Sequence, residues 1–403
     1  MLKNHVKQWL EQRIAALGLP LSLCLLDQQW VNPLPSAKVT IALRTPRALL
    51  SLANPTFGKL AKAYVEQDLD FGGNLRDILE ICARLCGTDV EIGMQKISHN
   101  WKWWRHTRRA DREAISRHYD VSNDFYALWL DRQRVYSCAY FKAPEDTLDQ
   151  AQEQKLDLIC RKLNLQQNER FLDIGCGWGG LILRAAQHYG VNATGITLSR
   201  NQHEYVEQKI RDLGLQQRCR VLLCDYRDLD EGEPYDKIAS VGMFEHVGKR
   251  NFALYFGKIY RLLKPGGLVM NHSITQTSPE GGELGSDAGQ FIEEYVFPGG
   301  ELQHVSVVLE AMARQKLECR DAENLRAHYA KTLWHWVERL EANRDAAREI
   351  AGEKTYRIWR IYMAGSATAF ERGWLSIYQL VAGRPLADGT LSYPLTREFV
   401  YRA

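Results

Sequence analysis

A carboxylate and four glycines lie close together in one short stretch of the chain. Asp173 lies in the apolar run FLDI, and Gly175, Gly177, Gly179 and Gly180 follow it. Glycines leave the backbone bare and free to turn tightly, so a ligand can lie against it where a strand passes into a helix. The spacing also satisfies G-x-G-x-x-G, in which a helix N-terminus receives a pyrophosphate. The stretch therefore predicts a ligand site.

The charge of Asp173 separates the candidate ligands. An ionised carboxylate repels a pyrophosphate and attracts an ammonium group. A dinucleotide site also needs Asp or Glu about 20 residues further on, at the end of the second strand, whereas the expected strand 192–199 offers Thr197 and Ser199. We therefore predict a zwitterionic ligand, the methionine part of S-adenosylmethionine, and disfavour a nicotinamide dinucleotide.

Polar residues recur where later strands are expected to end. Asp225 closes RVLLCD and is placed either to accept a hydrogen bond from an adenine amino group or to begin a turn. Glu245 follows an apolar strand, where desolvation makes a carboxylate an effective base or cation stabiliser, or it begins a helix. His272 is a candidate through its expected strand-end position, against the alternative of a core histidine. Cys138 is a nucleophile only if a base or cation lowers its pKa, and otherwise a small buried hydrophobe.

Alternating helices and strands from about residue 150 must position these side chains. The expected helices are DQAQEQKLDLICRKLNL, LILRAAQHYG, NQHEYVEQKIRDLG and NFALYFGKIYRLLKPGG, and the expected strands are RFLDIGCG, NATGITLS, CRVLLCDY, DKIASVGMF and GLVMNHSIT. This order predicts an α/β fold with a doubly wound, mostly parallel sheet that binds its ligand at the carboxyl ends of the strands. Residues 1 to about 95 predict a small α+β domain, with a helix over 3–18 and a strand within 37–45. After residue 300 the chain is expected to be largely helical and aromatic.

Composition limits the function classes. The 403 residues are 45% hydrophobic and 25% charged, as in folded proteins, and 52 Lys and Arg against 49 Asp and Glu leave a net charge of only +3. This small surplus does not predict a nucleic-acid partner. The nine cysteines lack metal-ligand spacing, so we expect a reducing cytosol and no metal site. No apolar run approaches the 18 residues needed to cross a bilayer, so we expect a protein that is neither exported nor membrane-spanning.

A basic, tryptophan-rich stretch covers residues 101–117. It begins WKWW and carries six Lys or Arg over 102–117. Aromatic rings beside cations suit a membrane headgroup region or a nucleic-acid backbone, and a linker with solvated arginines has the same composition. No RNA-binding module accompanies the stretch, which disfavours a nucleic-acid methyltransferase.

Together the motifs resemble a known family. HYDVSNDFY (118–126), YSCAYF (136–141), LDIGCGWGG (172–180), GITLS (195–199), DYRDL (225–229), SVGMFEHVG (240–248) and YVFPGG (295–300) are similar to the bacterial cyclopropane-fatty-acyl-phospholipid synthases. The resemblance runs from about residue 115 to the C-terminus. It implies a class I S-adenosylmethionine-dependent methyltransferase sheet with helical lipid-binding insertions. The implied domains are an N-terminal lipid-interacting domain (1–95), a basic Trp-rich linker (96–114) and a catalytic domain (115–403).

The resemblance also implies an activity and its residues. The implied reaction transfers a methylene unit from S-adenosylmethionine to the cis double bond of unsaturated acyl chains in membrane phospholipids. The residues implied to bind the cofactor are Tyr136, Ser137, Asp173, Gly175, Cys176, Gly177, Gly179, Thr197, Leu198, Gln202, Asp225, Tyr226 and Arg227. The residues implied to hold a catalytic bicarbonate ion are Cys138, Glu245, His272, the Ile274 backbone and Tyr329.

The implied mechanism assigns roles to these groups. Methyl transfer leaves a carbocation, which Glu245 and nearby aromatic faces are expected to stabilise. Bicarbonate then removes a proton so that the ring closes, and Cys138 becomes a hydrogen-bonding wall of the anion site instead of a nucleophile. The aromatic C-terminal helices are expected to line an acyl tunnel. We expect a cytoplasmic homodimer, peripheral at the inner face of the membrane. Alternatives are an enzyme that makes methyl- or methylene-branched chains, and a lipid-binding protein with an idle cofactor loop.

Overall fold

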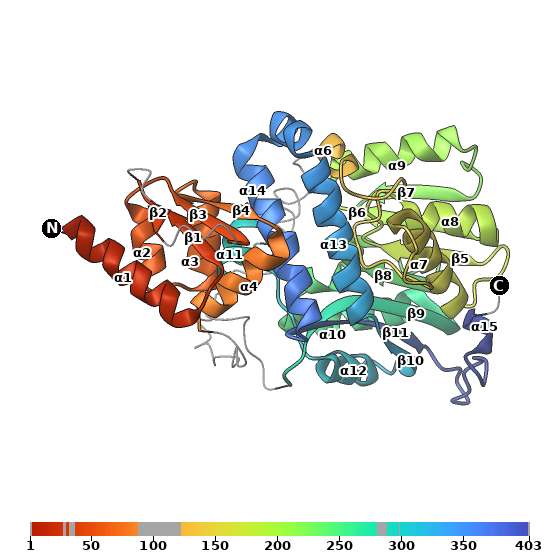
Figure 1. The fold of residues 1–403 in the computed structure, drawn as a ribbon. Coiled ribbons are helices and arrows are strands. Elements are labelled where there is room, and N and C mark those ends of the chain that lie inside the picture. The colour runs from red at the N-terminus through yellow and green to blue at the C-terminus, as the bar shows by residue number, and fades with distance from the viewer. Residues whose placement is uncertain are drawn as a thin grey trace. The chain divides into compact units, whose positions relative to one another are not determined.

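Two compact units make up the structure, a computed structural model drawn in Figure 1. The described residues are 2–26, 30–31, 37–87, 122–279, 288–297 and 299–401. The first unit comprises 1–99, 282–298 and 344–368, and the second comprises 100–281, 299–343 and 369–403. The chain therefore passes between the units several times. The expected linker and the tryptophan-rich stretch lie outside the described residues, and the domain boundaries stay a prediction.

The first unit is built on a four-stranded sheet of order β2-β1-β3-β4, in which only β1 and β3 are parallel. Its strands are β1 (Leu21–Cys24), β2 (Trp30–Val31), β3 (Val39–Leu43) and β4 (Leu69–Gly73). Its helices are α1 (Leu2–Leu17), α2 (Arg47–Ala53), α3 (Phe57–Val65), α4 (Leu75–Leu85), α11 (Ala288–Tyr295) and residues 344–368 of α14 (Arg344–Glu371). The predicted helix over 3–18 and the strand within 37–45 are confirmed.

Ion pairs join the late segments of the first unit to its early ones. In α14, Arg357 contacts the Asp70 carboxylate at 2.6 Å and donates to the Tyr64 carbonyl at 2.9 Å. Lys62 of α3 pairs with Glu294 of α11 at 3.0 Å. The fold of this unit therefore includes segments that lie more than 200 residues apart in the chain.

The second unit contains the predicted doubly wound sheet. In sheet order, its strands are β10 (Glu318–Asn324), β11 (Leu375–Gly383), β9 (Leu263–Gln276), β8 (Tyr235–Val241), β5 (Arg170–Ile174), β6 (Asn192–Thr197) and β7 (Cys219–Leu223). Neighbours from β9 to β7 are parallel, and β11 and β10 are added antiparallel. The mostly parallel sheet is thus confirmed.

Helices cover both faces of this sheet (Figure 1). One face carries α7 (Leu148–Lys162), α8 (Gly180–Tyr189) and α9 (Arg200–Asp212), and the other carries α10 (Phe252–Leu262) and α12 (Val305–Arg314). In β5, Phe171 packs into the core under α7 and α8, whereas Leu172 and Ile174 pack into the core under α10 and α12. Because successive strand side chains alternate between faces, Asp173 is directed to the α7 face.

The expectation of a largely helical region after residue 300 is only partly right. The helices α13 (Arg326–Ala342), α14 and the short α15 (Glu398–Tyr401) are present, but β10 and β11 were missed. The sequence of β11, LSIYQLVAG, is buried at eight of its nine positions. A strand buried on both faces reads as a continuous apolar run, which periodicity does not distinguish from a buried helix.

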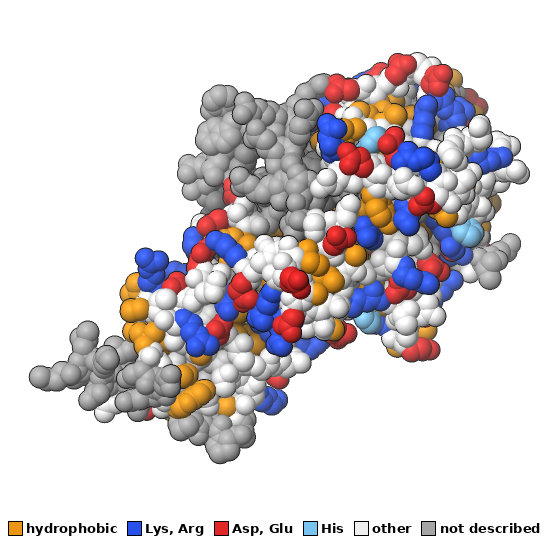
Figure 2. Space-filling view, turned by 90° about the horizontal axis from the view of Figure 1, so that it is seen from above, with side chains coloured by type: hydrophobic (Ala, Val, Ile, Leu, Met, Phe, Trp, Pro, Cys, Tyr) orange, Lys and Arg blue, Asp and Glu red, His pale blue; other side chains and the backbone are white. Residues whose placement is uncertain are grey.

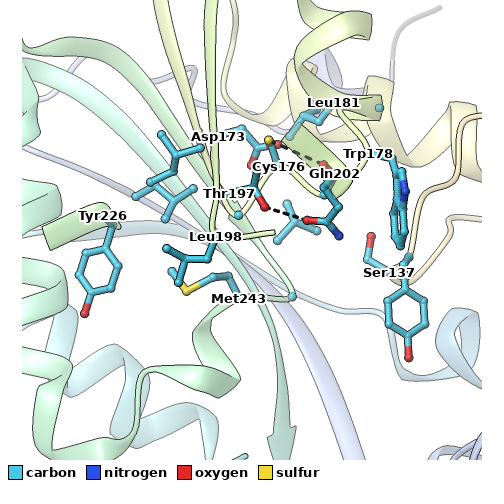
Figure 3. Close-up of a pocket in the computed structure, with 18 of the residues that line it drawn as sticks. Ser137, Asp173, Cys176, Trp178, Leu181, Thr197, Leu198, Gln202, Tyr226 and Met243 are labelled. Carbon is cyan, nitrogen blue, oxygen red and sulfur yellow. Dashed lines mark hydrogen bonds between the residues drawn. The ribbon is translucent and has the colours of Figure 1, made fainter. Parts of the chain in front are cut away.

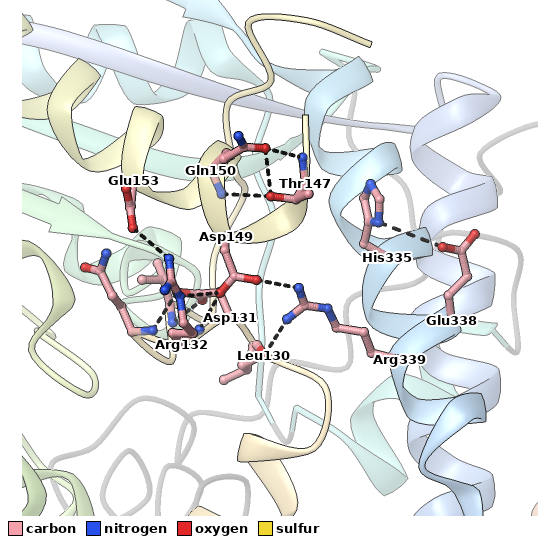
Figure 4. Close-up of polar contacts among 12 residues, drawn as sticks. Leu130, Asp131, Arg132, Thr147, Asp149, Gln150, Glu153, His335, Glu338 and Arg339 are labelled. Carbon is pink, nitrogen blue, oxygen red and sulfur yellow. Dashed lines mark hydrogen bonds and ion pairs between the residues drawn. The ribbon is translucent and has the colours of Figure 1, made fainter. Parts of the chain in front are cut away.

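Polar contacts fix the start of α7 against α13 (Figure 4). Thr147 and Gln150 form a reciprocal capping box at the N-terminus of α7. The Arg339 guanidinium of α13 donates to the Asp149 carboxylate at 2.6 Å and to the Leu130 carbonyl at 2.8 Å. These contacts hold the two helices that carry Lys155 and Tyr329, residues of the candidate site.

The surface shows charge of both signs. On the face in Figure 2, Lys and Arg side chains are interspersed with Asp and Glu, in keeping with the net charge of +3. Within the described part of the chain, no helix has the length and apolar character required to span a bilayer. The same residues contain no cluster of three or more His, Cys, Asp or Glu suited to a metal ion.

Candidate functional site

A pocket opens at the carboxyl ends of β5, β6, β7 and β8. Figure 3 shows Tyr226 at one end, Trp178 and Ser137 at the other, and Asp173, Thr197 and Leu198 between them. The residues predicted to bind the cofactor that line this pocket are Tyr136, Ser137, Asp173, Gly175, Cys176, Gly177, Thr197, Leu198, Gln202, Asp225, Tyr226 and Arg227. Gly179 is the one member of that predicted set that the pocket lining lacks.

Two glycines explain the shape of the loop after β5. Gly175 has φ +83°, and a Cβ there would lie 2.9 Å from the Cβ of Met243. Gly179 has φ +84° as the N-cap of α8, and a Cβ there would lie 2.9 Å from Val206. Both positions combine left-handed backbone with close packing, which only glycine accommodates without strain. Gly179 therefore shapes the turn without lining the pocket.

The Asp173 carboxylate is buried without a complete set of partners. The residue is 3% exposed, and its Oδ1 has no hydrogen-bond partner within the described structure. Burial raises the pKa of Asp173 to about 7, although the nearby Lys155 charge acts in the opposite direction. A buried carboxylate without partners is costly, so a ligand ammonium placed here would supply the missing charge and hydrogen bonds.

Lys155 is a pocket residue that the sequence interpretation missed. Its side chain is 1% exposed, and its Nζ donates to the Ser137 Oγ at 2.9 Å. Burial lowers the pKa of Lys155 to about 8. The signal was present in the expected helix: Gln152, Lys155 and Lys162 occupy the inward stripe together with Ile159, and all four are buried. Polar residues at the apolar positions of a helix indicate that its buried face contacts other polar groups or a ligand.

The turn from β6 to α9 fixes the Gln202 side chain in the pocket lining. Ser199 caps α9 by accepting from the Gln202 backbone N–H. The Thr197 hydroxyl donates to the Gln202 Oε1 at 2.8 Å (Figure 3). Because that contact engages the amide oxygen, the Gln202 NH₂ is the group left for a ligand. The 4% exposed side chain of Gln202 is thus held as a donor.

Asp225 begins a turn, and its predicted hydrogen bond to an adenine amino group stays a prediction. It lines the pocket and also caps the short helix η1 (Tyr226–Asp228). The Arg227 side chain donates to Oδ1 at 2.8 Å and to Oδ2 at 2.6 Å, and the Arg227 backbone N–H donates to Oδ1 at 2.9 Å. These bonds hold the Asp225 carboxylate in a fixed orientation at the edge of the pocket.

The residues predicted to hold bicarbonate lie outside the lining of this pocket. Glu245, in the short helix η2 (Phe244–His246), accepts from the Ile274 backbone N–H at 2.7 Å, so these two are brought together. Burial raises the pKa of Glu245 to about 7. The Oε2 of Glu245 is buried and has no hydrogen-bond partner within the described residues.

The prediction that His272 ends a strand is wrong. His272 pairs with Val241, the last residue of β8, but β9 continues to Gln276 because β11 extends the ladder on its other side. Burial lowers the pKa of His272 well below its usual value, so the ring is neutral. Its Nδ1 contacts the Gln379 Nε2 at 3.1 Å. An amide NH₂ only donates, so Nδ1 accepts and Nε2 carries the proton, and that Nε2 has no partner among the described groups.

Cys138 and Tyr329 meet at the start of α13. The Cys138 Sγ lies 3.8 Å from the Leu325 carbonyl oxygen, which also accepts from the Tyr329 backbone N–H. The Leu325 N–H donates to Ile377, which is the register partner of Ile274. The Leu325 carbonyl thus links Cys138 with the Tyr329 backbone, and the Leu325 N–H is bonded to β11, the strand that lies beside Ile274. Burial raises the pKa of the Cys138 thiol, and a thiol in this state is a poor nucleophile.

Aromatic rings connect the pocket with Tyr329. Tyr126 lies 4.8 Å from Trp178 and 5.8 Å from Tyr136 between ring centroids. Tyr136 lies 5.3 Å from Trp336, which in turn lies 6.1 Å from Tyr329. Ring faces attract cations, so this cluster can stabilise positive charge that develops beside the pocket.

Comparisons with known proteins agree with this geometry. A family model described as mycolic acid cyclopropane synthetase matches residues 106–380. A probable fatty acid methyltransferase of Pseudomonas putida is 45% identical over 393 residues, covering 96% of this chain and 98% of the relative.

Two solved structures share the fold. The cyclopropane synthase MmaA2 from Mycobacterium tuberculosis has a TM-score of 0.65 at 35% identity, covering 68% of this chain and 98% of that one. The mycolic acid cyclopropane synthase CmaA1, complexed with SAH and CTAB, has a TM-score of 0.64 at 36% identity, with the same two coverages. The predicted fold class is thereby confirmed.

Proposed function

The chain belongs to the mycolic acid cyclopropane synthetase family, and we propose that it forms cyclopropane rings on the unsaturated acyl chains of membrane phospholipids. Membership makes it an S-adenosylmethionine-dependent methyltransferase that acts on lipids, as its motifs predicted. The proposed reaction transfers a methylene unit to a cis double bond, passes through a carbocation, and ends when a proton is lost and the ring closes.

One observation carries the cofactor assignment. The buried Asp173 carboxylate lacks a partner for Oδ1, and it shares one pocket with the donors of Ser137 and Gln202. S-Adenosylmethionine carries an ammonium and a carboxylate on the same carbon, and this pocket offers an acceptor for the first and donors for the second. The CmaA1 relative was solved with SAH, which supports this assignment.

The residues outside the pocket support the lipid step. An alkene is a weak nucleophile, so alignment with the sulfonium methyl in a dry site is required, and such positioning lowers a barrier by up to about 7 to 11 kcal/mol. Tyr136 lines the pocket and contacts Trp336, which supports the proposal that ring faces stabilise the developing positive charge. Glu245 adds a carboxylate whose Oε2 atom is buried.

A bicarbonate ion is part of the proposal, as the base that takes the proton from the transferred methyl. Within the described residues the His272 Nε2 has no partner and is available to an anion oxygen, and the Leu325 carbonyl links Cys138 with the Tyr329 backbone. The Ile274 N–H already donates to Glu245, so an ion bound there requires the Glu245 side chain to rotate away. The proposal therefore requires one side-chain movement before an anion can accept from the Ile274 N–H.

The lipid product tests the proposal. The protein is incubated with vesicles of cis-monounsaturated phospholipid and S-adenosylmethionine labelled with ¹³C in its methyl group, and the extracted lipid is studied by NMR. Upfield cyclopropane signals that carry the label are expected. Labelled lipid that shows olefinic or methyl-branch signals instead would contradict ring formation.

A second candidate function has its own support. The Pseudomonas putida relative matches nearly the whole chain and is named as a probable fatty acid methyltransferase. A methyl-branched alkene arises if the carbocation loses a proton from a neighbouring chain carbon, and a methylene branch arises if a 1,2-hydride shift first moves the charge to the methylated carbon, which then loses a methyl proton. The NMR experiment separates these products, and supplying free fatty acid in parallel with phospholipid tests the substrate. Action at the inner membrane face as a homodimer is proposed from the family resemblance.

A further inference from the structure

A buried lysine without a carboxylate partner lines the cofactor pocket. Four lysines of the described chain have exposed fractions below 9%: Lys155, Lys162, Lys237 and Lys258. Lys162 pairs with Glu323 at 2.5 Å, Lys237 with Glu169 at 3.7 Å and Lys258 with Glu231 at 2.8 Å. Among the described residues, only Lys155 of these four has no carboxylate within ion-pair distance.

The absence of a carboxylate partner makes the burial of the Lys155 ammonium energetically unfavourable. A buried ammonium costs several kcal/mol unless it is paired and hydrogen-bonded. Within the described structure, the Lys155 ammonium donates a hydrogen bond to the Ser137 hydroxyl at 2.9 Å. Asp173 lines the same pocket and also lacks a partner, yet it forms no ion pair with Lys155 within 4.0 Å. The pocket thus holds two separated, opposite charges that do not neutralise each other by direct contact.

The bond from Lys155 also sets the direction of the Ser137 hydroxyl. An ammonium only donates, so the Ser137 Oγ must accept, and the Ser137 proton is left to point elsewhere. Both residues line the pocket. The serine is 8% exposed and is therefore held as a donor toward a ligand. A carboxylate accepts from such a donor, whereas an ammonium is repelled by the adjacent charge.

We propose that Lys155 is the positioning residue that recognises the α-carboxylate of the cofactor, acting through the Ser137 hydroxyl, while Asp173 recognises the ammonium group. The two buried charges then form the complement of a zwitterion. This inference rests on the proposed use of S-adenosylmethionine, and it assigns the carboxylate to a residue of α7 outside the glycine-rich loop. Burial lowers the pKa of Lys155, and the charges of Asp131 and Asp173 act in the opposite direction without direct contact.

Three ligands that differ in their amine and carboxylate groups test the roles of Lys155 and Asp173 separately. They are S-adenosylhomocysteine, its decarboxylated analogue, which keeps the amine and loses the carboxylate, and 5′-methylthioadenosine, which lacks both. Isothermal titration measures each against the full chain, Lys155→Met, Asp173→Asn and Lys237→Met. The last variant removes a buried lysine that pairs with Glu169 and lies outside the pocket lining, so it is the matched control.

The expected pattern is specific to each charge. Lys155→Met should weaken S-adenosylhomocysteine by about 10- to 100-fold, the range for a hydrogen bond to a charged group, and leave the decarboxylated analogue within about twofold. Asp173→Asn should weaken both amine-containing ligands and spare 5′-methylthioadenosine. Lys237→Met should change none of the three.

Two outcomes would overturn the inference. If Lys155→Met loses equal affinity for S-adenosylhomocysteine and for its decarboxylated analogue, the lysine only supports the pocket structure. If the affinity for neither ligand falls, the lysine does not contact this part of the ligand. If Lys155→Met does not fold, Ser137→Ala decides by the same comparison, because it removes the relaying hydroxyl and keeps the lysine. The lipid reaction fails separately: the binding pattern can hold while the NMR product experiment gives no labelled lipid.

Discussion

Cofactor affinity should depend on pH through the ionisation of Asp173. Burial raises the pKa of this carboxyl from 3.8 to about 7 in the free protein. An ammonium ligand binds the ionised form, so binding lowers that pKa again, and affinity falls as pH drops below about 7. With a pKa of about 7, the ionised fraction is about 0.9 at pH 8 and about 0.03 at pH 5.5. The expected loss of affinity is therefore about 30-fold, or about 2 kcal/mol at 1.36 kcal/mol per pH unit.

Isothermal titration of S-adenosylhomocysteine from pH 8 to pH 5.5 measures this loss. Over that range the ligand carboxylate stays ionised and its amine stays protonated, and 5′-methylthioadenosine provides the control without either group. Asp173→Asn should bind weakly at every pH and show no acid limb. An acid limb that persists in Asp173→Asn, or an equal limb for 5′-methylthioadenosine, would refute the assignment of Asp173 to the ammonium.

Three further predictions concern the neighbouring residues. Glu245→Gln should reduce the rate of labelled-lipid formation by at least about 100-fold, the scale of a lost electrostatic stabiliser. The affinity for S-adenosylhomocysteine should stay within about twofold, because Glu245 contacts Ile274 outside the pocket lining. A large loss of affinity would contradict this separation of roles. Cys138→Ser should keep measurable activity, since burial raises the pKa of the Cys138 thiol, and complete loss of activity in a folded variant would favour a nucleophile. Arg339→Ala should lower the free energy of unfolding by about 1 kcal/mol, because the Asp149 carboxylate and the Leu130 carbonyl lose a donor. An unchanged denaturation midpoint would show that these contacts contribute nothing to stability.

The nucleotide-binding half of the fold was predictable because each element has a clear local signal. The strand that carries Asp173 is short and apolar, and the glycines behind it mark the turn into α8. The loop residues predicted for the cofactor were therefore placed around one pocket. The antiparallel strands were not predictable, since β10 is mostly polar and β11 is buried at eight of its nine positions, Ser376 and Gln379 included, so neither shows the alternation that identifies a half-buried strand.

Lys155 shows a different limit of sequence reasoning. A lysine in a charged helix is ordinarily solvated, and its burial depends on which face of α7 meets the sheet. That face is set by contacts with residues far away in the chain, among them Lys162 with Asp321 and Glu323. The register of His272 depends in the same way on β11, a strand that lies more than 100 residues later.

The first unit contains segments from late in the chain, and this has a consequence for truncated forms of the protein. Arg357 of α14 is bonded to Asp70 and to Tyr64, and Lys62 is bonded to Glu294. A truncation that removes the first 99 residues to obtain a minimal enzyme would deprive these late segments of their partners, and Arg357 would lose Asp70 and Tyr64 while it keeps its ion pair with Glu353 of the same helix. The same helix continues into the second unit at residue 369, and Phe370 there packs 4.7 Å from Tyr329. Deletion of the N-terminal region is thus expected to perturb the catalytic half as well.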